Sequence, residues 1–150
     1  MKIMSDAKKI ENPTIMSRKL LFLHKIPILK TRKFWDGLKE GKIYATRCRK
    51  CGQSYYPPQA DCFKCLASDM EYFEIANEGE IVTFVASYLV PQGFENYQIP
   101  YIIAIVKTSN ELKLMGFIEG IDYKNIKVGM KVKITTKIQP DGFPAIVFIP

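Results

Sequence analysis

The chain has 150 residues, of which 47% are hydrophobic and 25% charged, so it can build a core and is not compositionally disordered. No apolar run approaches the ~18 residues of a membrane span and no secretory signal is evident, so we expect a cytoplasmic protein that does not bind membranes. The net charge of +7 is uneven: residues 1–47 hold 12 Lys and Arg against 4 Asp and Glu, residues 48–78 are net −2 and residues 79–150 net +1. A basic arm therefore precedes a nearly neutral body.

Residues 1–41 are predicted to form a basic helical arm. A helix is expected at residues 31–40, with Thr31 as a suitable N-cap and Gly41 as a suitable stop. Its apolar face would carry Phe34, Trp35 and Leu38. A weaker helical pattern covers residues 14–24 and includes His24, the single histidine of the chain.

Residues 42–78 are predicted to form a zinc ribbon. Two C-x-x-C pairs separated by ten residues use every cysteine of the chain, namely Cys48, Cys51, Cys62 and Cys65. Without a secretory signal, this spacing favours a tetrahedral four-thiolate site over disulfides. We expect structural Zn²⁺, with Fe as a minor alternative, because sulfur fills all four positions and none is open for catalysis. Gly52 suits the first turn, whereas the second turn lacks a glycine and is expected to be looser.

Residues 79–150 are predicted to form five strands, at 79–90, 101–108, 112–118, 131–138 and 143–149. Five strands in about 70 residues, with a long first strand, favour a small closed barrel of the OB type over a β-sandwich. The predicted fold class is therefore mainly β with an N-terminal helical arm, in which a zinc ribbon is followed by a five-stranded OB-fold barrel.

The sequence contains no arrangement typical of a catalytic centre. His24 has no partner, every cysteine belongs to the metal motif, and neither a phosphate-binding glycine loop nor a nucleophile elbow is present. Asp36 and Glu40 lie one helical turn apart, but such pairs are usually solvated. We therefore do not expect the chain to be an enzyme.

The order of these motifs resembles one prokaryotic family, long catalogued as a domain of unknown function. That family has an N-terminal rubredoxin-like zinc ribbon and a C-terminal OB fold. The residues that carry the resemblance are Phe34, Trp35, Gly41, Thr46-Arg47-Cys48, Cys51-Gly52, Tyr56-Pro57-Pro58, Cys62, Cys65, Gly79 to Phe84, Pro100-Tyr101, Gly129-Met130 and Phe148-Ile149-Pro150. The match spans residues 30–150. It departs from the family at Phe63, where proline is usual, and at Leu66, where glycine or serine is usual.

The resemblance implies a non-catalytic scaffold that binds an acetoacetyl-CoA thiolase, sometimes together with hydroxymethylglutaryl-CoA synthase, and that holds acyl-CoA between ribbon and barrel. A CoA site needs cations for the phosphates and an aromatic and apolar wall for the remainder. The candidate residues are Arg32, Lys33, Phe34, Trp35, Arg47, Arg49, Lys50, Tyr55 and Tyr56. Structural roles compete with this interpretation, because Phe34 and Trp35 suit a core, and Arg49 and Lys50 would compensate the thiolates.

Single-stranded nucleic-acid binding is the alternative function, since OB folds and zinc ribbons often have it. Tyr101 and Phe117 would stack on bases, but residues 79–119 hold 2 Lys against 4 Glu and would repel phosphate. A third hypothesis is a pure adaptor. In it, the loop 91–100 either projects Phe94 and Tyr97 onto a partner or folds back as a lid.

Overall fold

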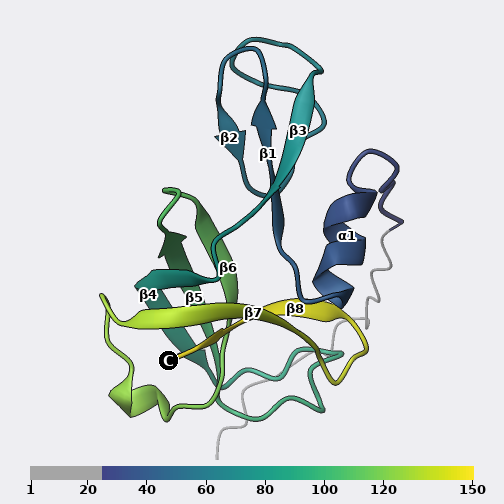
Figure 1. Cartoon of the computed structure of the whole chain (residues 1–150). Coiled ribbons are helices and arrows are strands. Elements are labelled where there is room, and N and C mark those ends of the chain that lie inside the picture. The colour runs from purple at the N-terminus through teal and green to yellow at the C-terminus, as the bar shows by residue number, and fades with distance from the viewer. Residues whose placement is uncertain (1–24) are drawn as a thin grey trace, which may run out of the picture.

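The computed structural model describes residues 25–150 (Figure 1). The predicted helix at 14–24 and His24 lie outside the described residues. The elements are α1 (Arg32–Lys39), the ribbon strands β1 (Tyr44–Cys48), β2 (Ser54–Tyr55) and β3 (Met70–Glu74), the barrel strands β4 (Glu78–Ser87), β5 (Tyr101–Thr108), β6 (Lys113–Ile118), β7 (Lys131–Ile138) and β8 (Pro144–Ile149), and the 3-10 helix η1 (Tyr123–Asn125). None of the described helices has the length and apolar character to cross a membrane.

Helix α1 lies where its sequence pattern places it. It follows Thr31, although the Thr31 side chain makes no capping hydrogen bond. At its end Gly41 adopts a φ of +82°, which lets the Lys42 N–H donate to the Gly37 carbonyl at 2.8 Å. On its apolar face Phe34 and Leu38 are buried and Trp35 is half-buried, and the helix packs against β1, β7 and β8. It therefore joins the ribbon to the barrel.

The ribbon is a three-stranded antiparallel sheet in the order β2-β1-β3. It stands above the barrel, with α1 beside it (Figure 1). The two cysteine turns lie at the end of that sheet that is distant from the barrel.

The barrel is closed, in the order β4-β5-β6-β8-β7, and this closure excludes the β-sandwich. Neighbouring strands are antiparallel except β6 and β8, which are parallel. Four strands lie within a residue of their predicted bounds. The prediction for the first strand was wrong at its end: pairing stops at Ser87, opposite Tyr101, and residues 88–90 are exposed.

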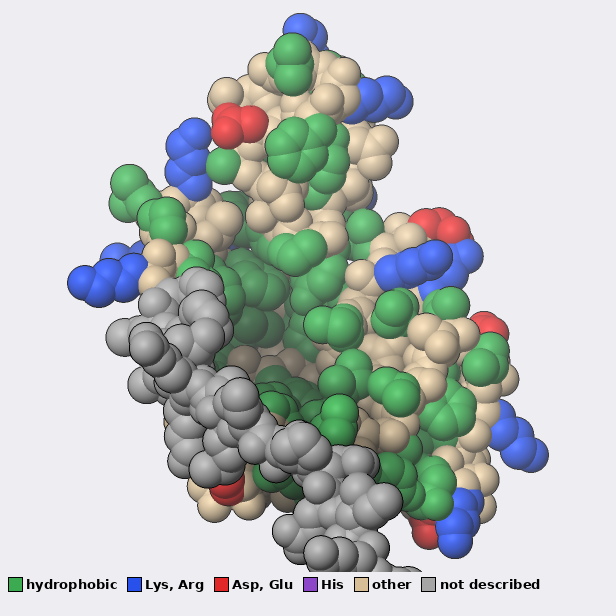
Figure 2. Space-filling view, turned by 180° about the vertical axis from the view of Figure 1, so that it is seen from behind, with side chains coloured by type: hydrophobic (Ala, Val, Ile, Leu, Met, Phe, Trp, Pro, Cys, Tyr) green, Lys and Arg blue, Asp and Glu red, His purple; other side chains and the backbone are tan. Residues whose placement is uncertain are grey.

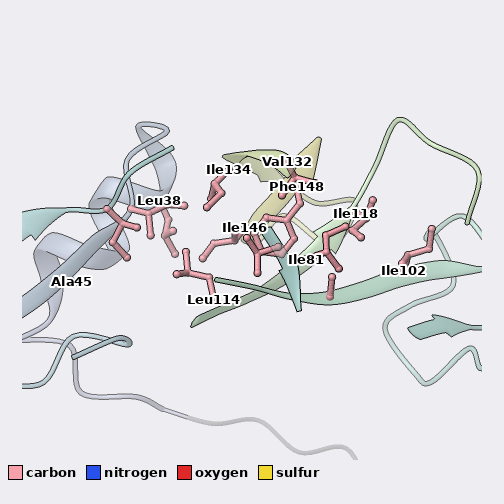
Figure 3. Packing of buried hydrophobic residues seen from close by; sticks show 14 of the residues in the cluster. Leu38, Ala45, Ile81, Ile102, Leu114, Ile118, Val132, Ile134, Ile146 and Phe148 are labelled. Atoms are coloured by element: carbon pink, nitrogen blue, oxygen red, sulfur yellow. The ribbon is translucent and has the colours of Figure 1, made fainter. Parts of the chain in front are cut away.

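One hydrophobic core joins the three parts of the chain (Figure 3). Inside the barrel, Leu114, Val106 and Phe148 are fully buried. Leu38 of α1 and Ala45 of β1 belong to the same cluster of buried residues. These shared apolar contacts hold the helix and the ribbon against the barrel.

Candidate metal centre

The four cysteine sulfurs converge as the spacing predicts. All four Sγ atoms lie within 4.8 Å of one another, with Cys48 to Cys65 at 3.6 Å and Cys51 to Cys62 at 3.5 Å. A tetrahedral ion with metal–sulfur bonds of about 2.3 Å requires sulfurs ~3.8 Å apart. The donor set and its spacing therefore fit a metal ion held by four thiolates.

The two cysteine turns have nearly the same backbone geometry. In the first, the Gly52 N–H donates to the Cys48 carbonyl at 2.8 Å, with a φ of +74° at Gly52. In the second, the Leu66 N–H donates to the Cys62 carbonyl at 2.9 Å, with a φ of +58° at Leu66. The expectation of a looser second turn was therefore wrong. Leu66 adopts the left-handed conformation in place of a glycine, at an energetic cost.

Replacing Leu66 with glycine is expected to raise the free energy of unfolding by about 0.5–1 kcal/mol. The Leu66 side chain is 84% exposed, so its removal loses little burial while it relieves the left-handed strain. Denaturant unfolding of the metal-loaded protein measures the change. Leu89→Gly is the matched control, because Leu89 is 78% exposed and is not among the residues with positive φ. Equal or lower stability for Leu66→Gly would argue against strain at this turn.

Tyr55 supports the metal site through a hydrogen bond to sulfur. Its hydroxyl lies 3.2 Å from the Cys62 Sγ and accepts from the Lys64 N–H at 3.3 Å. This hydrogen bond is the main cause that lowers the pKa of Cys62 to about 6. The thiolate is the form that binds metal, so Tyr55 favours binding at neutral pH.

The pKa of the Cys65 thiol is shifted in the opposite direction from that of Cys62. The Ala67 N–H acts to lower its pKa, but burial and the three neighbouring cysteine thiols outweigh that bond and raise the pKa to about 12. Four sulfurs at this spacing cannot all be anionic without a compensating positive charge. A bound metal cation supplies that charge, which agrees with the donor geometry.

The Tyr55→Phe variant is expected to bind Zn²⁺ ~10-fold more weakly, because it keeps the ring and removes the hydrogen bond to Cys62. Competition with a chromophoric chelator measures the affinity. Tyr72→Phe serves as the control, since it removes a hydroxyl whose bond goes to the Lys30 carbonyl, away from sulfur. If the two variants had equal affinities, Tyr55 would have no role in metal binding.

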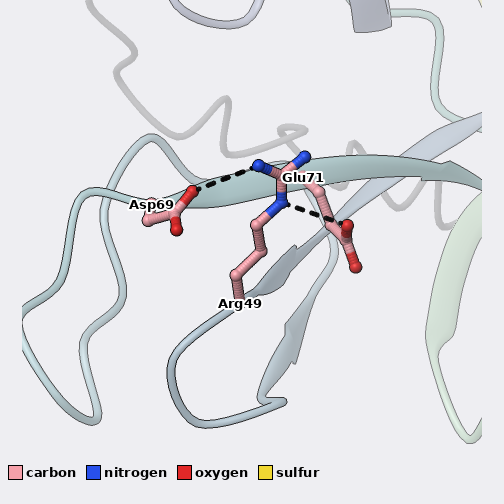
Figure 4. Close-up of polar contacts among 3 residues, drawn as sticks. All are labelled: Arg49, Asp69 and Glu71. Atoms are coloured by element: carbon pink, nitrogen blue, oxygen red, sulfur yellow. Dashed lines mark hydrogen bonds and ion pairs between the residues drawn. The ribbon is translucent and has the colours of Figure 1, made fainter.

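Arg49 is engaged with carboxylates on the ribbon (Figure 4). Its Nε lies 3.2 Å from a Glu71 carboxylate oxygen and its Nη1 lies 3.7 Å from Asp69. Its backbone N–H also donates to the Asp69 carbonyl at 3.0 Å. The first cysteine turn is thereby tied to β3. Lys50, next in the turn, is exposed.

The other predicted cations lie on separate parts of the surface. The Arg47 guanidinium lies 4.8 Å from the centre of the Phe73 ring. The Lys33 ammonium lies 4.8 Å from the centre of the Tyr44 ring. Arg32 pairs at 3.3 Å with the carboxylate one helical turn along α1. The structure therefore does not gather the five predicted cations into a single rim.

Three of the four predicted aromatic residues do come together where α1 meets the ribbon. The Phe34 ring is edge-on to Trp35 at 5.3 Å and to Tyr56 at 6.1 Å, measured between ring centroids. Phe34 is only 8% exposed and Trp35 is half-buried. Burial raises the pKa of Tyr56 to about 12. Phe34 thus has the predicted core role, while Trp35 and Tyr56 stay partly accessible.

The loop between β4 and β5 folds back over the barrel. Phe94 and Tyr97 stack on each other with centroids 4.4 Å apart, and Tyr97 reaches Phe117 at 5.7 Å. The Tyr97 hydroxyl donates to an Asp141 carboxylate oxygen at 2.9 Å. The prediction that the loop projects Phe94 and Tyr97 onto a partner is therefore wrong, and the prediction that it folds back as a lid is confirmed.

Clefts lie on the barrel within residues 25–150. One, of about 510 Å³, has walls from the lid and from β6 and β7, and includes Tyr97, Phe117 and Lys137. The other, of about 970 Å³, lies beside β4 and β7 and includes Glu80 and Lys131. The sequence did not predict either cleft, because each is formed by segments distant in the chain.

Two family models match consecutive parts of the chain. The model described as "ChsH2, rubredoxin-like zinc ribbon domain" matches residues 35–71, and "ChsH2, C-terminal OB-fold domain" matches residues 72–137. Together they cover the ribbon and most of the barrel.

Two relatives extend this similarity. A "DUF35 domain-containing scaffold protein" of Methanocaldococcus jannaschii is 28% identical over 116 residues, which cover 75% of this chain and 82% of the relative. "Benzoylsuccinyl-CoA thiolase subunit BbsA" of Thauera aromatica is 24% identical over 109 residues, which cover 68% of this chain and 70% of the relative.

A solved structure has the same fold. The chain titled "Ltp2-ChsH2(DUF35) aldolase" aligns with a TM-score of 0.73 at 22% identity, covering 85% of this chain and 98% of the other. Ribbon and barrel are thus present together in a structure determined independently.

Proposed function

The chain belongs to the ChsH2 family of DUF35 proteins, and on this premise we propose that it is a non-catalytic accessory subunit that binds acyl-CoA beside a thiolase-type enzyme. The names of its relatives support the proposal, since one is a scaffold protein and another a thiolase subunit. A hydroxymethylglutaryl-CoA synthase is the second enzyme that this scaffold would bind. The proposed metal is Zn²⁺, with Fe as the minor alternative, and its proposed role is structural, because four thiolates leave no open position for a substrate.

The observation that carries the acyl-CoA proposal is a hollow lined with hydrophobic side chains on the rear face of the molecule, below the ribbon (Figure 2). Such a surface suits an acyl-pantetheine chain, which is long and largely apolar. Trp35 and Tyr56, at the junction of α1 and the ribbon, supply partly accessible rings for the adenine. Lys33 on the same helix supplies a cation for a phosphate.

Nucleic-acid binding has less support from the same surfaces. The rings of Tyr101 and Phe117 are packed against each other, with centroids 6.2 Å apart, and against Tyr97 of the lid. Their faces are therefore less available to bases. Lys137, beside this cluster, is paired with Glu119 at 2.6 Å, so its charge does not attract phosphate strongly.

Isothermal titration with acetoacetyl-CoA tests the acyl-CoA proposal. The metal-loaded chain is titrated alone and together with the thiolase encoded in the same genome, and saturable binding is expected in at least one of the two arms. Trp35→Ala should weaken this binding ~10-fold, because a stacking ring is lost. Phe63→Ala is the matched control, since Phe63 is 70% exposed and lies in the second cysteine turn. The absence of binding heat in both arms would contradict the acyl-CoA part of the proposal.

A further inference from the structure

The outer face of β4, β5 and β6 carries two rows of paired side chains. In one row Thr83 lies opposite Ile105, which lies opposite Met115. In the next, Val85 lies opposite Ile103, which lies opposite Phe117. Residues next to them in sequence, such as Ala104 and Leu114, point into the barrel and are buried. These six outward residues are the apolar barrel face: Thr83, Val85, Ile103, Ile105, Met115 and Phe117.

The apolar barrel face is accessible and carries no charge. Val85 is 57% exposed and Met115 is 67% exposed, while Ile103, Ile105 and Phe117 are half-buried. A sheet with one face in the core normally has polar residues on the other, as β7 does with its exposed lysines. Five apolar side chains side by side on three paired strands depart from that rule. Patches of this kind on a folded surface mark interaction sites.

The surroundings define the limits of this face. At one end, the next outward row is charged and consists of Glu80, Lys107 and Lys113. At the other end, Phe117 contacts the aromatic rings of the lid. Beyond Val85 and Ser87, the chain continues into three more exposed apolar residues, Tyr88, Leu89 and Val90. The apolar barrel face thus has a charged row at one end and continues into an apolar loop at the other, an arrangement typical of the core of a protein interface.

The size of this face indicates which partner covers it. The six residues of the face with Ser87, Tyr88, Leu89, Val90 and Tyr101 make eleven, whereas a stable interface uses about 20–30 residues on each side. In a dimer of this chain, two convex barrels would pack against each other, and the contact would be limited to these two faces. A different protein with a concave surface would extend the contact to the loop and beyond.

We infer that the apolar barrel face is the docking surface for the thiolase-type enzyme subunit, which presents an uncharged apolar surface to it. The inference rests on the proposed function, and it goes further by assigning the enzyme to β4–β6, separate from the metal centre. Val85 and Met115 are expected to make the main contacts, because they are the most exposed of the five apolar members of the two rows.

The double variant Val85→Glu, Met115→Glu tests the inference. It places two carboxylates within the face while leaving the buried side of each strand unchanged, so the barrel should fold. Its affinity for the purified thiolase of the same genome, measured by biolayer interferometry with the full metal-loaded chain, should fall roughly 30-fold or more. Val128→Glu is the matched control, because Val128 is 66% exposed and lines the cleft beside β4 and β7. It should bind as the wild type does.

The possible results separate the inference from the proposed function. If the wild type binds the thiolase and the double variant binds it equally well, the assignment of the docking surface is overturned and the accessory role is unaffected. A wild type that does not bind the thiolase would overturn both. Sedimentation would reveal the third case, in which the wild type is a dimer and the double variant a monomer. That result would assign the face to a second copy of this chain and overturn the inference.

Discussion

Replacing Cys48 with serine is expected to unfold the ribbon and to leave most of the barrel folded. Cys48 is 1% exposed and is both a thiolate of the metal site and the last residue of β1. The ribbon sheet is small, and structural zinc contributes about 10–16 kcal/mol to folding in zinc-finger peptides. Loss of one ligand should therefore remove most of the stability of β1–β3. Amide hydrogen exchange would detect this as loss of protection in the ribbon, with β5 and β6 still protected.

Two measurements test whether the loss of protection in the ribbon is caused by loss of the metal. Chelation of the wild type should reproduce the exchange pattern of Cys48→Ser, and metal analysis should find no bound ion in either sample. Ser54→Ala is the control in the same sheet, because it removes a partner of Arg47 but no metal ligand. A ribbon that remained protected without metal would refute a structural role for the four thiolates.

Replacing Gly116 with alanine is expected to destabilise the barrel by about 3 kcal/mol. Gly116 lies on β6 where the barrel closes against β8, and a Cβ atom there would lie 2.5 Å from the Ile146 carbonyl oxygen. A backbone atom cannot move aside as a flexible side chain can, so β6 and β8 would have to separate. Denaturant unfolding followed by circular dichroism measures the loss.

Met115→Ala is the appropriate control for Gly116→Ala. Met115 precedes Gly116 on β6, but its side chain is exposed, so truncation should change the unfolding free energy by less than about 0.5 kcal/mol. If Gly116→Ala were as mild as this control, close packing of β6 against β8 would not be required for barrel closure.

The strands and the metal ligands were predictable because local patterns determine them. Alternation along 131–138 and the C-x-x-C spacing specify side-chain directions before any tertiary contact is known. The end of the first strand was not predictable in this way. Residues 88–90 have the composition of a strand, but a strand requires a partner, and the pairing ends opposite Tyr101.

The surroundings of the candidate site depend on contacts between distant residues. Tyr55 and Cys62 are seven positions apart, and nothing in either motif specifies that the hydroxyl will reach the sulfur. The segment 101–106 is apolar at every position, a pattern typical of a strand buried on both faces. In the structure one of its faces is in the core and the other belongs to the apolar barrel face. Sequence alone does not distinguish these two cases.

Native mass spectrometry of the chain co-expressed with the thiolase of the same genome tests the central claim most directly. The accessory-subunit proposal predicts a complex of fixed stoichiometry in which every copy of this chain retains one metal ion. Separate masses for the two proteins, at concentrations well above the dissociation constant of a stable complex, would contradict the proposal.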